Sequence, residues 1–218
     1  MAGRSKRRGV MPSAHEILQG LSTAANTWTF LAVFWHAYFA ALLVPVLLGW
    51  RPSQVVVGTL LASPLASVSV LAWVVGNPFN GAIFALLFVA LMALILRRPL
   101  RRMELTSPAW IVIGAALFVF AWIYPHFLEG RPLYSYLYLA PLGLIPCPTL
   151  SMMIGMTILL GGVDSRAWTL VVGAAGIFYG IFGSLRLGVT IDWALTAGAL
   201  CLLAQGVQRI RRGREGAT

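Results

Sequence analysis

The sequence predicts an all-α protein, a bundle of seven transmembrane helices preceded by a short N-terminal amphipathic helix on the membrane interface. Hydrophobic residues make up 59% of the 218 residues and charged residues only 10%, whereas soluble domains hold roughly 45–50% and about 25%. The apolar residues form blocks of about 17–25 residues, the length that crosses a bilayer. Because the connections are short and no water reaches the hydrocarbon, helices are the spanning form that satisfies the backbone.

Residues 1–26 are the first predicted unit, a basic tail followed by an amphipathic helix. Ser13 after Pro12, with Glu16 three residues later, is typical of a capping box at a helix start. The next apolar residues recur at helical spacing: Ile17, Leu18 and Leu21. We therefore expect residues 12–25 to form a helix that lies on the outer interface; the alternative is a frayed polar tail.

The transmembrane domain is predicted over residues 27–207, with a basic cytoplasmic tail at 208–218. Prolines, glycines and charged residues separate its apolar blocks and mark the turns. The predicted spans are 27–49, 55–76, 81–96, 108–125, 146–162, 167–184 and 188–207. Most tryptophans fall near the ends of these spans, as in the aromatic belts of membrane proteins. No soluble domain is predicted.

The basic residues predict the orientation of the bundle. The net charge is +10 and the arginines gather in short flanks, which favours a role in membrane topology over nucleic-acid binding. The 97–102 loop and the tail "RIRRGR" each carry four arginines, so both are expected in the cytoplasm. The odd number of spans then places the N-terminus outside, although "RSKRR" at 4–8 opposes that placement. We expect a multi-pass protein of a cytoplasmic membrane.

Two spans carry features that predict how they pack. Pro64 in the second span lacks a backbone N–H and is expected to bend the helix, with hydroxyls such as that of Ser63 bonding the freed carbonyl. In the sixth span, four glycines with 3-4-3 spacing predict a face that another helix backbone approaches closely: Gly173, Gly176, Gly180 and Gly183. We expect this face to pack within the chain; homodimerisation is the alternative.

The stretch "LGLIPCPTLSMMIGM" interrupts the apolar pattern. Pro146 and Pro148 would disrupt a helix interior, but proline is well tolerated in the first turn. One interpretation therefore starts the fifth span here, with Cys147 near the N-cap and Thr149 helping to bond free N–H groups. The other is a discontinuous helix over 137–162, broken in mid-membrane as in many transporters.

Cys147 is the first candidate for chemistry. The positive end of a helix dipole favours its thiolate, whereas apolar burial opposes it. The predicted topology places His126 and Asp192 on the same outer side of the membrane. Because Cys, His and carboxylate side chains bind transition metals, Cys147, His126 and Asp192 are the candidate metal or ligand site. Interfacial capping and hydrogen bonding are the simpler explanation for each, since no pair has ligand spacing.

Other cofactor sites are less favoured. Met152, Met153 and Met156 could offer soft sulfur ligands to copper(I), but methionines in such a helix are expected to pack. His36 with His126 could ligate haem, but no paired-histidine pattern is present, and a hydrogen-bonded structural histidine is expected at position 36. No phosphate-binding loop, HExxH, GxSxG or CxxCH occurs. No catalytic residue is therefore assigned, and no cofactor is firmly implied.

The chain also resembles a known family over two stretches. "PLGLIPCPTLSMMIGMTILL" at 141–160 and "FYGIFGSLRLGVTIDWALTAGALCLL" at 178–203 are similar to an uncharacterised family of small bacterial integral membrane proteins. In that family a G-L-x-P-C-P-T motif opens a late span, here Gly143 through Thr149, and an aspartate, here Asp192, precedes the last helix. The resemblance implies a seven-span bundle in a bacterial inner membrane and implies no activity.

Three classes of function remain open. Short loops, glycine packing faces and the absent catalytic motifs favour a non-catalytic accessory or structural subunit of a membrane complex, with the bilayer and other subunits as partners. A small-molecule transporter or channel is the second class, with gates at 146–148 and Pro64. The third is an extracytoplasmic-facing metal or redox protein that uses Cys147. No nucleic-acid partner is expected, and no homo-oligomer is indicated.

Overall fold

The computed structural model describes residues 13–97, 102–103, 106–161 and 165–215, with side chains to residue 209. Over these residues the chain is helical and has no β-strand. The helices are α1 (Ala14–Thr27), α2 (Thr29–Leu47), α3 (Gln54–Val74), α4 (Pro78–Leu96), α5 (Pro108–Ile123), α6 (Tyr136–Leu139), α7 (Pro146–Leu159), α8 (Arg166–Ile181) and α9 (Trp193–Glu215). A π-helical segment, Phe182–Arg186, extends α8, and a 3-10 turn, Thr190–Asp192, precedes α9.

Within the described residues, five segments are long and apolar enough to cross a membrane: Thr29–Leu47, Gln54–Val74, Pro78–Leu96, Arg166–Arg186 and Thr190–Arg209. Helices α5 and α7 are apolar but shorter, at 16 and 14 residues. At 1.5 Å per residue they measure about 24 and 21 Å. The prediction of a helical membrane protein is thus confirmed at the level of fold class and hydropathy.

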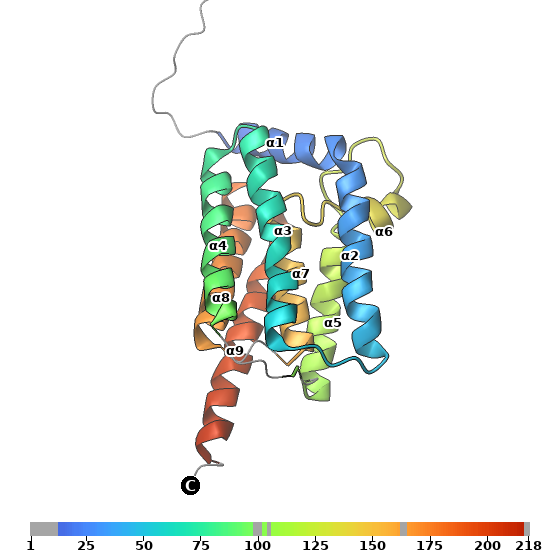
Figure 1. Ribbon diagram of the computed structural model, residues 1–218. Coiled ribbons are helices and arrows are strands. Elements are labelled where there is room, and N and C mark those ends of the chain that lie inside the picture. Colours follow the sequence, from blue (N-terminus) through green and yellow to red (C-terminus); the bar gives the residue numbers. More distant parts are fainter. Residues whose placement is uncertain (1–12, 98–101, 104–105, 162–164, 216–218) are drawn as a thin grey trace, which may run out of the picture.

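Helix α1 lies across one end of the bundle, roughly perpendicular to the helices beneath it (Figure 1). From α2 to α5 and from α7 to α9, successive helices run alternately away from α1 and back towards it. Helices α4 and α9 both end at the side of the bundle opposite α1. The capping box predicted for α1 is confirmed, because the Glu16 N–H donates to Ser13 Oγ at 3.2 Å and the Ser13 N–H donates to the Glu16 carboxylate at 2.8 Å.

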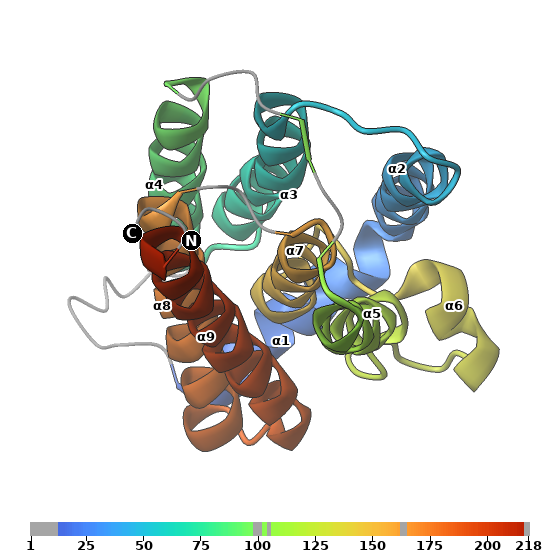
Figure 2. The same ribbon diagram turned by 90° about the horizontal axis from the view of Figure 1, so that it is seen from below.

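Helix α7 is the centre of the bundle. Viewed along the helices, it lies between α3, α5 and the α8–α9 pair (Figure 2). Every residue from Pro146 to Leu159 is buried except Cys147, which is half-buried. A helix that is apolar on all sides and enclosed by others is typical of a core helix, so α7 contributes the largest share of the interior.

The chain before α7 is not a continuous helix. Helix α6 ends at Leu139, the following residues are irregular, and α7 begins at Pro146 with Ile145 as its N-cap. The prediction that a helix starts at the prolines is therefore confirmed. Thr149 does bond a free N–H group, but in the loop and not in the first turn of α7: its hydroxyl accepts from the Gly143 N–H at 2.9 Å and donates to Ile145 O at 2.7 Å. The Thr149 hydroxyl thus stabilises the preceding loop, because that loop folds back against the start of α7.

The carbonyl freed by Pro64 finds hydroxyl partners, as predicted. Leu60, four residues earlier, has a carbonyl that accepts from Ser63 Oγ and from Tyr38 OH, both at 2.9 Å. Helix α3 therefore runs through Pro64 without leaving that carbonyl unbonded, and Tyr38 ties it to α2.

The glycine face of α8 packs within the chain. A Cβ at Gly173 would meet Leu203 of α9, and one at Gly176 would meet Ala199 of α9 and Ile154 of α7. A Cβ at Gly180 would collide with Thr196, and one at Gly183 with the Asp192 carboxylate. Glycine at these positions lets α8 and α9 approach closely, which is the intramolecular use of such a face.

Candidate functional site

The loop before α7 is buried and holds Cys147 in place. Gly143 adopts a φ of 72°, a left-handed conformation that favours glycine. A side chain there would collide with the ring of Trp35, so the loop passes directly against α2. The Thr149 hydroxyl closes this loop from within α7. Cys147 is thus fixed in the first turn of α7.

Asp192 is the most deeply placed carboxylate among the described residues. It lies in the turn before α9 and is only 1% exposed. Tyr124, which follows α5 and is fully buried, donates its hydroxyl to Asp192 Oδ1 at 2.7 Å. The Cys147 thiol lies beside the same carboxylate, and both side chains line one small cavity. Three elements distant in sequence therefore meet at this carboxylate.

Two asparagines continue the polar contacts towards α4. The Tyr179 hydroxyl donates to Asn80 Oδ1 at 3.0 Å, and the Asn80 N–H donates to Asn77 Oδ1 at 3.1 Å. The Cys147 sulfur lies 4.0 Å from the Tyr179 carbonyl oxygen. Polar groups thus extend from the α3–α4 turn through Tyr179 and Cys147 to Asp192, inside an otherwise apolar bundle.

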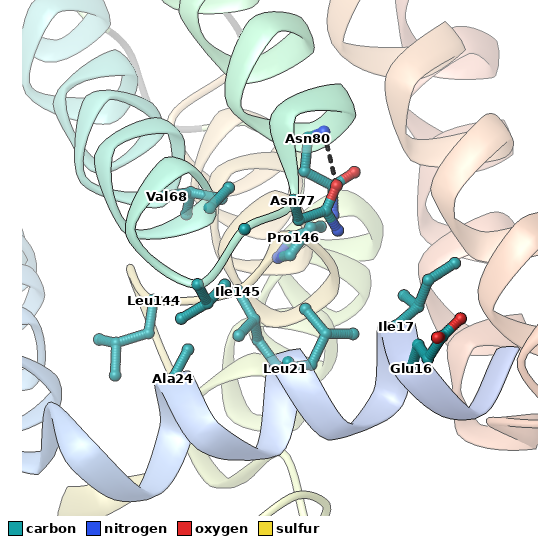
Figure 3. A pocket seen from close by; sticks show the side chains of 14 residues that line it. Glu16, Ile17, Leu21, Ala24, Val68, Asn77, Asn80, Leu144, Ile145 and Pro146 are labelled. Atoms are coloured by element: carbon teal, nitrogen blue, oxygen red, sulfur yellow. Dashed lines mark hydrogen bonds between the residues drawn. The ribbon is translucent and has the colours of Figure 1, made fainter. Parts of the chain in front are cut away.

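A cavity of about 400 Å³ lies between α1 and the rest of the bundle (Figure 3), on the side that is beneath α1 in the view of Figure 1. Helix α1 forms its roof through Glu16, Ile17 and Leu21, as the close-up shows. The α3–α4 connection with Asn77 and Asn80 and the loop that ends at Pro146 form the other walls. The lining is mainly aliphatic with a few polar groups, the usual character of a small-molecule site.

A second, small cavity of about 20 Å³ borders the Asp192 carboxylate. Its lining includes Cys147, Asp192 and Tyr179, and it shares five residues with the larger cavity: Ile17, Leu21, Asn80, Ile145 and Pro146. It is large enough for about one water molecule. The larger cavity and the Asp192 carboxylate are therefore near neighbours, separated by one water-sized space.

The C-terminal part of α1 is fastened to the loop after α5. The Asn26 amide donates to Phe127 O at 2.8 Å and accepts from the Glu129 N–H at 3.1 Å, while Ser22 Oγ donates to the Glu129 carboxylate. Phe127 has a φ of 76°, unusual for a bulky residue. This clamp holds the roof of the cavity over the bundle.

The structure brings two of the three candidate ligands together and leaves the third apart. Cys147 and Asp192 are adjacent, but His126 is exposed and packs its ring edge-on against Phe127. Among the described residues, no three His, Cys, Asp or Glu side chains are close enough to hold a metal ion. Desolvation by the surrounding chain lowers the pKa of the His126 imidazole.

The remaining candidates have structural surroundings. Both ring nitrogens of His36 lie near carbonyl oxygens, 2.8 Å from Ala32 O and 3.0 Å from Trp122 O, as expected for a structural histidine. The three methionines that follow Cys147 in α7 are fully buried: Met152, Met153 and Met156.

Sequence reasoning missed four residues of the site: Tyr124, Tyr179, Asn77 and Asn80. The asparagines were visible as the turn "NPFN", and Tyr124 as part of "YPHF", but neither pattern indicates which partners these side chains find. They come from the C-cap of α5, from α8, from the α3–α4 turn and from the first turn of α4, far apart in sequence.

Together the fold and the site define the class of this protein, an all-helical membrane-type bundle with a roofed cavity beside a buried carboxylate. No family model, curated protein or solved structure matches the chain. The resemblance to a family of small bacterial membrane proteins therefore stays a prediction.

Proposed function

We propose that this chain is a seven-span protein of a bacterial inner membrane, with α1 on the outer interface and the C-terminal tail in the cytoplasm. The alternating directions of α2 to α5 and α7 to α9 support this arrangement. Helices α4 and α9 both end on the side of the bundle opposite α1, which supports a cytoplasmic placement for the arginine-rich sequence beyond α4 and in the tail. Apolar side chains exposed on the outside of the bundle suit contact with lipid: for example Phe30, Val70, Leu86 and Val112.

Within that arrangement, we propose a small-molecule transporter that takes up its solute in the cavity beneath α1. The observation that carries this proposal is the 400 Å³ cavity, which adjoins an interrupted helix start and a buried ionisable residue. Transporters commonly place solute sites where irregular backbone meets the start of a half-length helix. An ionisable side chain within a spanning segment is by default a functional hypothesis. An accessory subunit of a membrane complex would need neither feature.

Access to the cavity can be tested with Cys147 as the reporter. In a Cys201→Ala background, a water-soluble methanethiosulfonate reagent applied from the α1 side should modify Cys147. Gly20→Phe, which places a ring in the cavity, should slow the modification several-fold. Gln19→Phe is the matched control, because Gln19 is exposed and does not line the cavity. Equal rates in the two variants would contradict the proposed entry route.

Transport further requires that the opposite side opens at some stage. Thr157, near the far end of α7, is fully buried and bonds Met153 O at 2.7 Å. In a Cys147→Ser, Cys201→Ala background, Thr157→Cys should react with the reagent supplied from the side opposite α1. A variant that keeps only Cys201, half-buried on α9, measures background access. If Thr157→Cys reacts no faster than the variant that keeps only Cys201, the bundle does not open on that side. That result contradicts transport and favours an accessory subunit.

A further inference from the structure

We infer that the cavity beneath α1 takes an amphipathic organic cation, and that this cation competes with a proton on Asp192. The inference rests on the proposed function and specifies the solute and the coupled ion. It depends on two independent observations. The charged side chains that line the cavities are acidic, and the described residues that face the Asp192 carboxylate are uncharged.

Within the described residues, the charged side chains on the linings of the two cavities are acidic. They are Glu16, at the end of α1 in Figure 3, whose carboxylate also accepts from the Ser13 N–H, and Asp192. The other polar side chains reaching the larger cavity are the amides of Asn77 and Asn80, set in aliphatic walls. An anion would enter this low-dielectric space without a counter-charge, which is strongly unfavourable. A cation with an apolar body matches both the walls and the charges.

Asp192 has a hydrogen-bond partner but no charged partner. The titratable groups that face it are the Tyr124 hydroxyl after α5, the Cys147 thiol of α7 and Tyr179 of α8. All three are neutral groups. Arg186 is exposed and lines a groove on the outer face of α8, and no ion pair joins it to Asp192 within the described chain. A buried carboxylate without a counter-ion is costly, so a proton and an entering cation would compete for Asp192.

The small cavity provides the route between proton and solute. It borders Asp192 and Cys147 on one side and shares Asn80 and Pro146 with the larger cavity on the other. One water there can carry a proton between the carboxyl and the larger cavity. When a cation enters, Asp192 releases its proton through that water to the aqueous solution, and the cation neutralises the carboxylate. The net charge of the site is unchanged by the exchange.

The test uses the full chain in lipid nanodiscs with two probes of similar shape, the cation tetraphenylphosphonium and the neutral triphenylphosphine oxide. Affinity for the cation should rise with pH, by up to about tenfold per pH unit where one proton is displaced. Binding in weak buffer should release about one proton per cation, detected with an indicator dye. The neutral probe should bind with no pH slope and no proton release.

Variants assign the proton to its residue. Asp192→Asn should lose both the pH slope and the proton release, whereas His126→Gln, which removes the nearby exposed imidazole, should keep both. A slope that persists in Asp192→Asn overturns the assignment. If that variant does not fold, proton release by the unmodified chain still decides, because cation binding without release contradicts the exchange.

The outcomes separate this inference from the proposed function. If both probes bind with the same pH-independent affinity, the cation–proton exchange is refuted and solute binding stands. If neither probe binds up to millimolar concentration, the inference fails, and the transporter proposal is judged by the reactivity of the cysteine at position 157. Binding of the cation alone, with proton release, supports both.

Discussion

The two ends of α7 have opposite surroundings although the same helix is buried along its length. At the N-terminal end, the loop before Pro146, the half-buried Cys147 and two cavities meet a chain of polar side chains. At the C-terminal end, the backbones of α5 and α7 touch. A Cβ at Gly155 would lie 2.8 Å from the Phe118 nitrogen, and one at Gly114 would lie 2.8 Å from the Leu159 nitrogen.

The far end is also closed by hydrogen bonds from α9. The Gln205 amide donates to Ile158 O at 3.2 Å and to Thr106 Oγ1 at 3.1 Å. The N-terminal end of α7 therefore has space for a solute, whereas its C-terminal end is closely packed. In a transporter, the α1 end would be the open approach and the glycine contacts of α5 and α7 would belong to the closed barrier. The following predictions test that contrast, from the largest expected effect to the smallest.

Gly155→Ala should have the largest effect, because its methyl group would press on backbone atoms of α5, which cannot rotate away. Overpacking of this kind costs up to about 3 kcal/mol in the free energy of unfolding. Denaturation in mixed detergent micelles measures it. Gly20→Ala is the matched control at the open end, since its nearest neighbour, Val75, lies at 4.0 Å. It should be neutral or gain up to about 1 kcal/mol from helix propensity. Equal losses in the two variants would remove the contrast between the ends.

Tyr124→Phe should have the next largest effect. It removes the hydroxyl that donates to Asp192 Oδ1 and leaves a buried acceptor short of a partner. Such a loss costs about 1–3 kcal/mol. Tyr134→Phe is the control, because Tyr134 is exposed. The same denaturation assay compares them, and an unchanged stability in Tyr124→Phe would show that Asp192 does not depend on this bond.

Asn26→Ala should have a smaller, local effect. It removes both bonds that join Asn26 to the loop after α5, each worth about 0.5–1.5 kcal/mol. Hydrogen exchange in α1 should quicken and Cys147 should react faster with aqueous reagents, while global unfolding changes little. Thr23→Ala is matched, since Thr23 bonds only Gln19 O within α1. Unchanged exchange in α1 would mean that other contacts hold the roof.

Much of the fold could be predicted from the sequence because each span is specified locally. Apolar block length, the capping box at Ser13 and the prolines before α7 all act within a few residues, and most helices begin and end close to the predicted positions. The last helix differs, because α9 begins at Trp193 and continues to Glu215, past the predicted end of the span at 207. The glycine pattern of α8 also predicted a close-packed face, since a 3-4-3 spacing follows from helix geometry alone.

The candidate site could be predicted only in part because its partners are distant in sequence. Cys147 and Asp192 stood out as unusual residues in apolar surroundings, but the tyrosine that bonds Asp192 comes from 68 residues earlier. His126 was grouped with them on topology alone. The chain after α5 turns so that Tyr124 is buried and His126 is exposed. The turn after α5, with Phe127 in the left-handed conformation, determines that Tyr124 points inward and His126 outward. The boundaries of a predicted span do not contain this information.

The smallest predicted effect concerns His126 and the pH dependence of the α1 end. Partial burial lowers the pKa of its imidazole below the usual value of 6.5, so the unfolded chain binds the proton more tightly. Stability should therefore fall slightly as pH drops through about 6.5 and below, and His126→Gln should remove that part of the fall. Denaturation of both proteins at pH 8 and pH 5 measures the difference. If His126→Gln steepens the loss at low pH, then protonated His126 stabilises the fold and the imidazole has an acidic partner in solution.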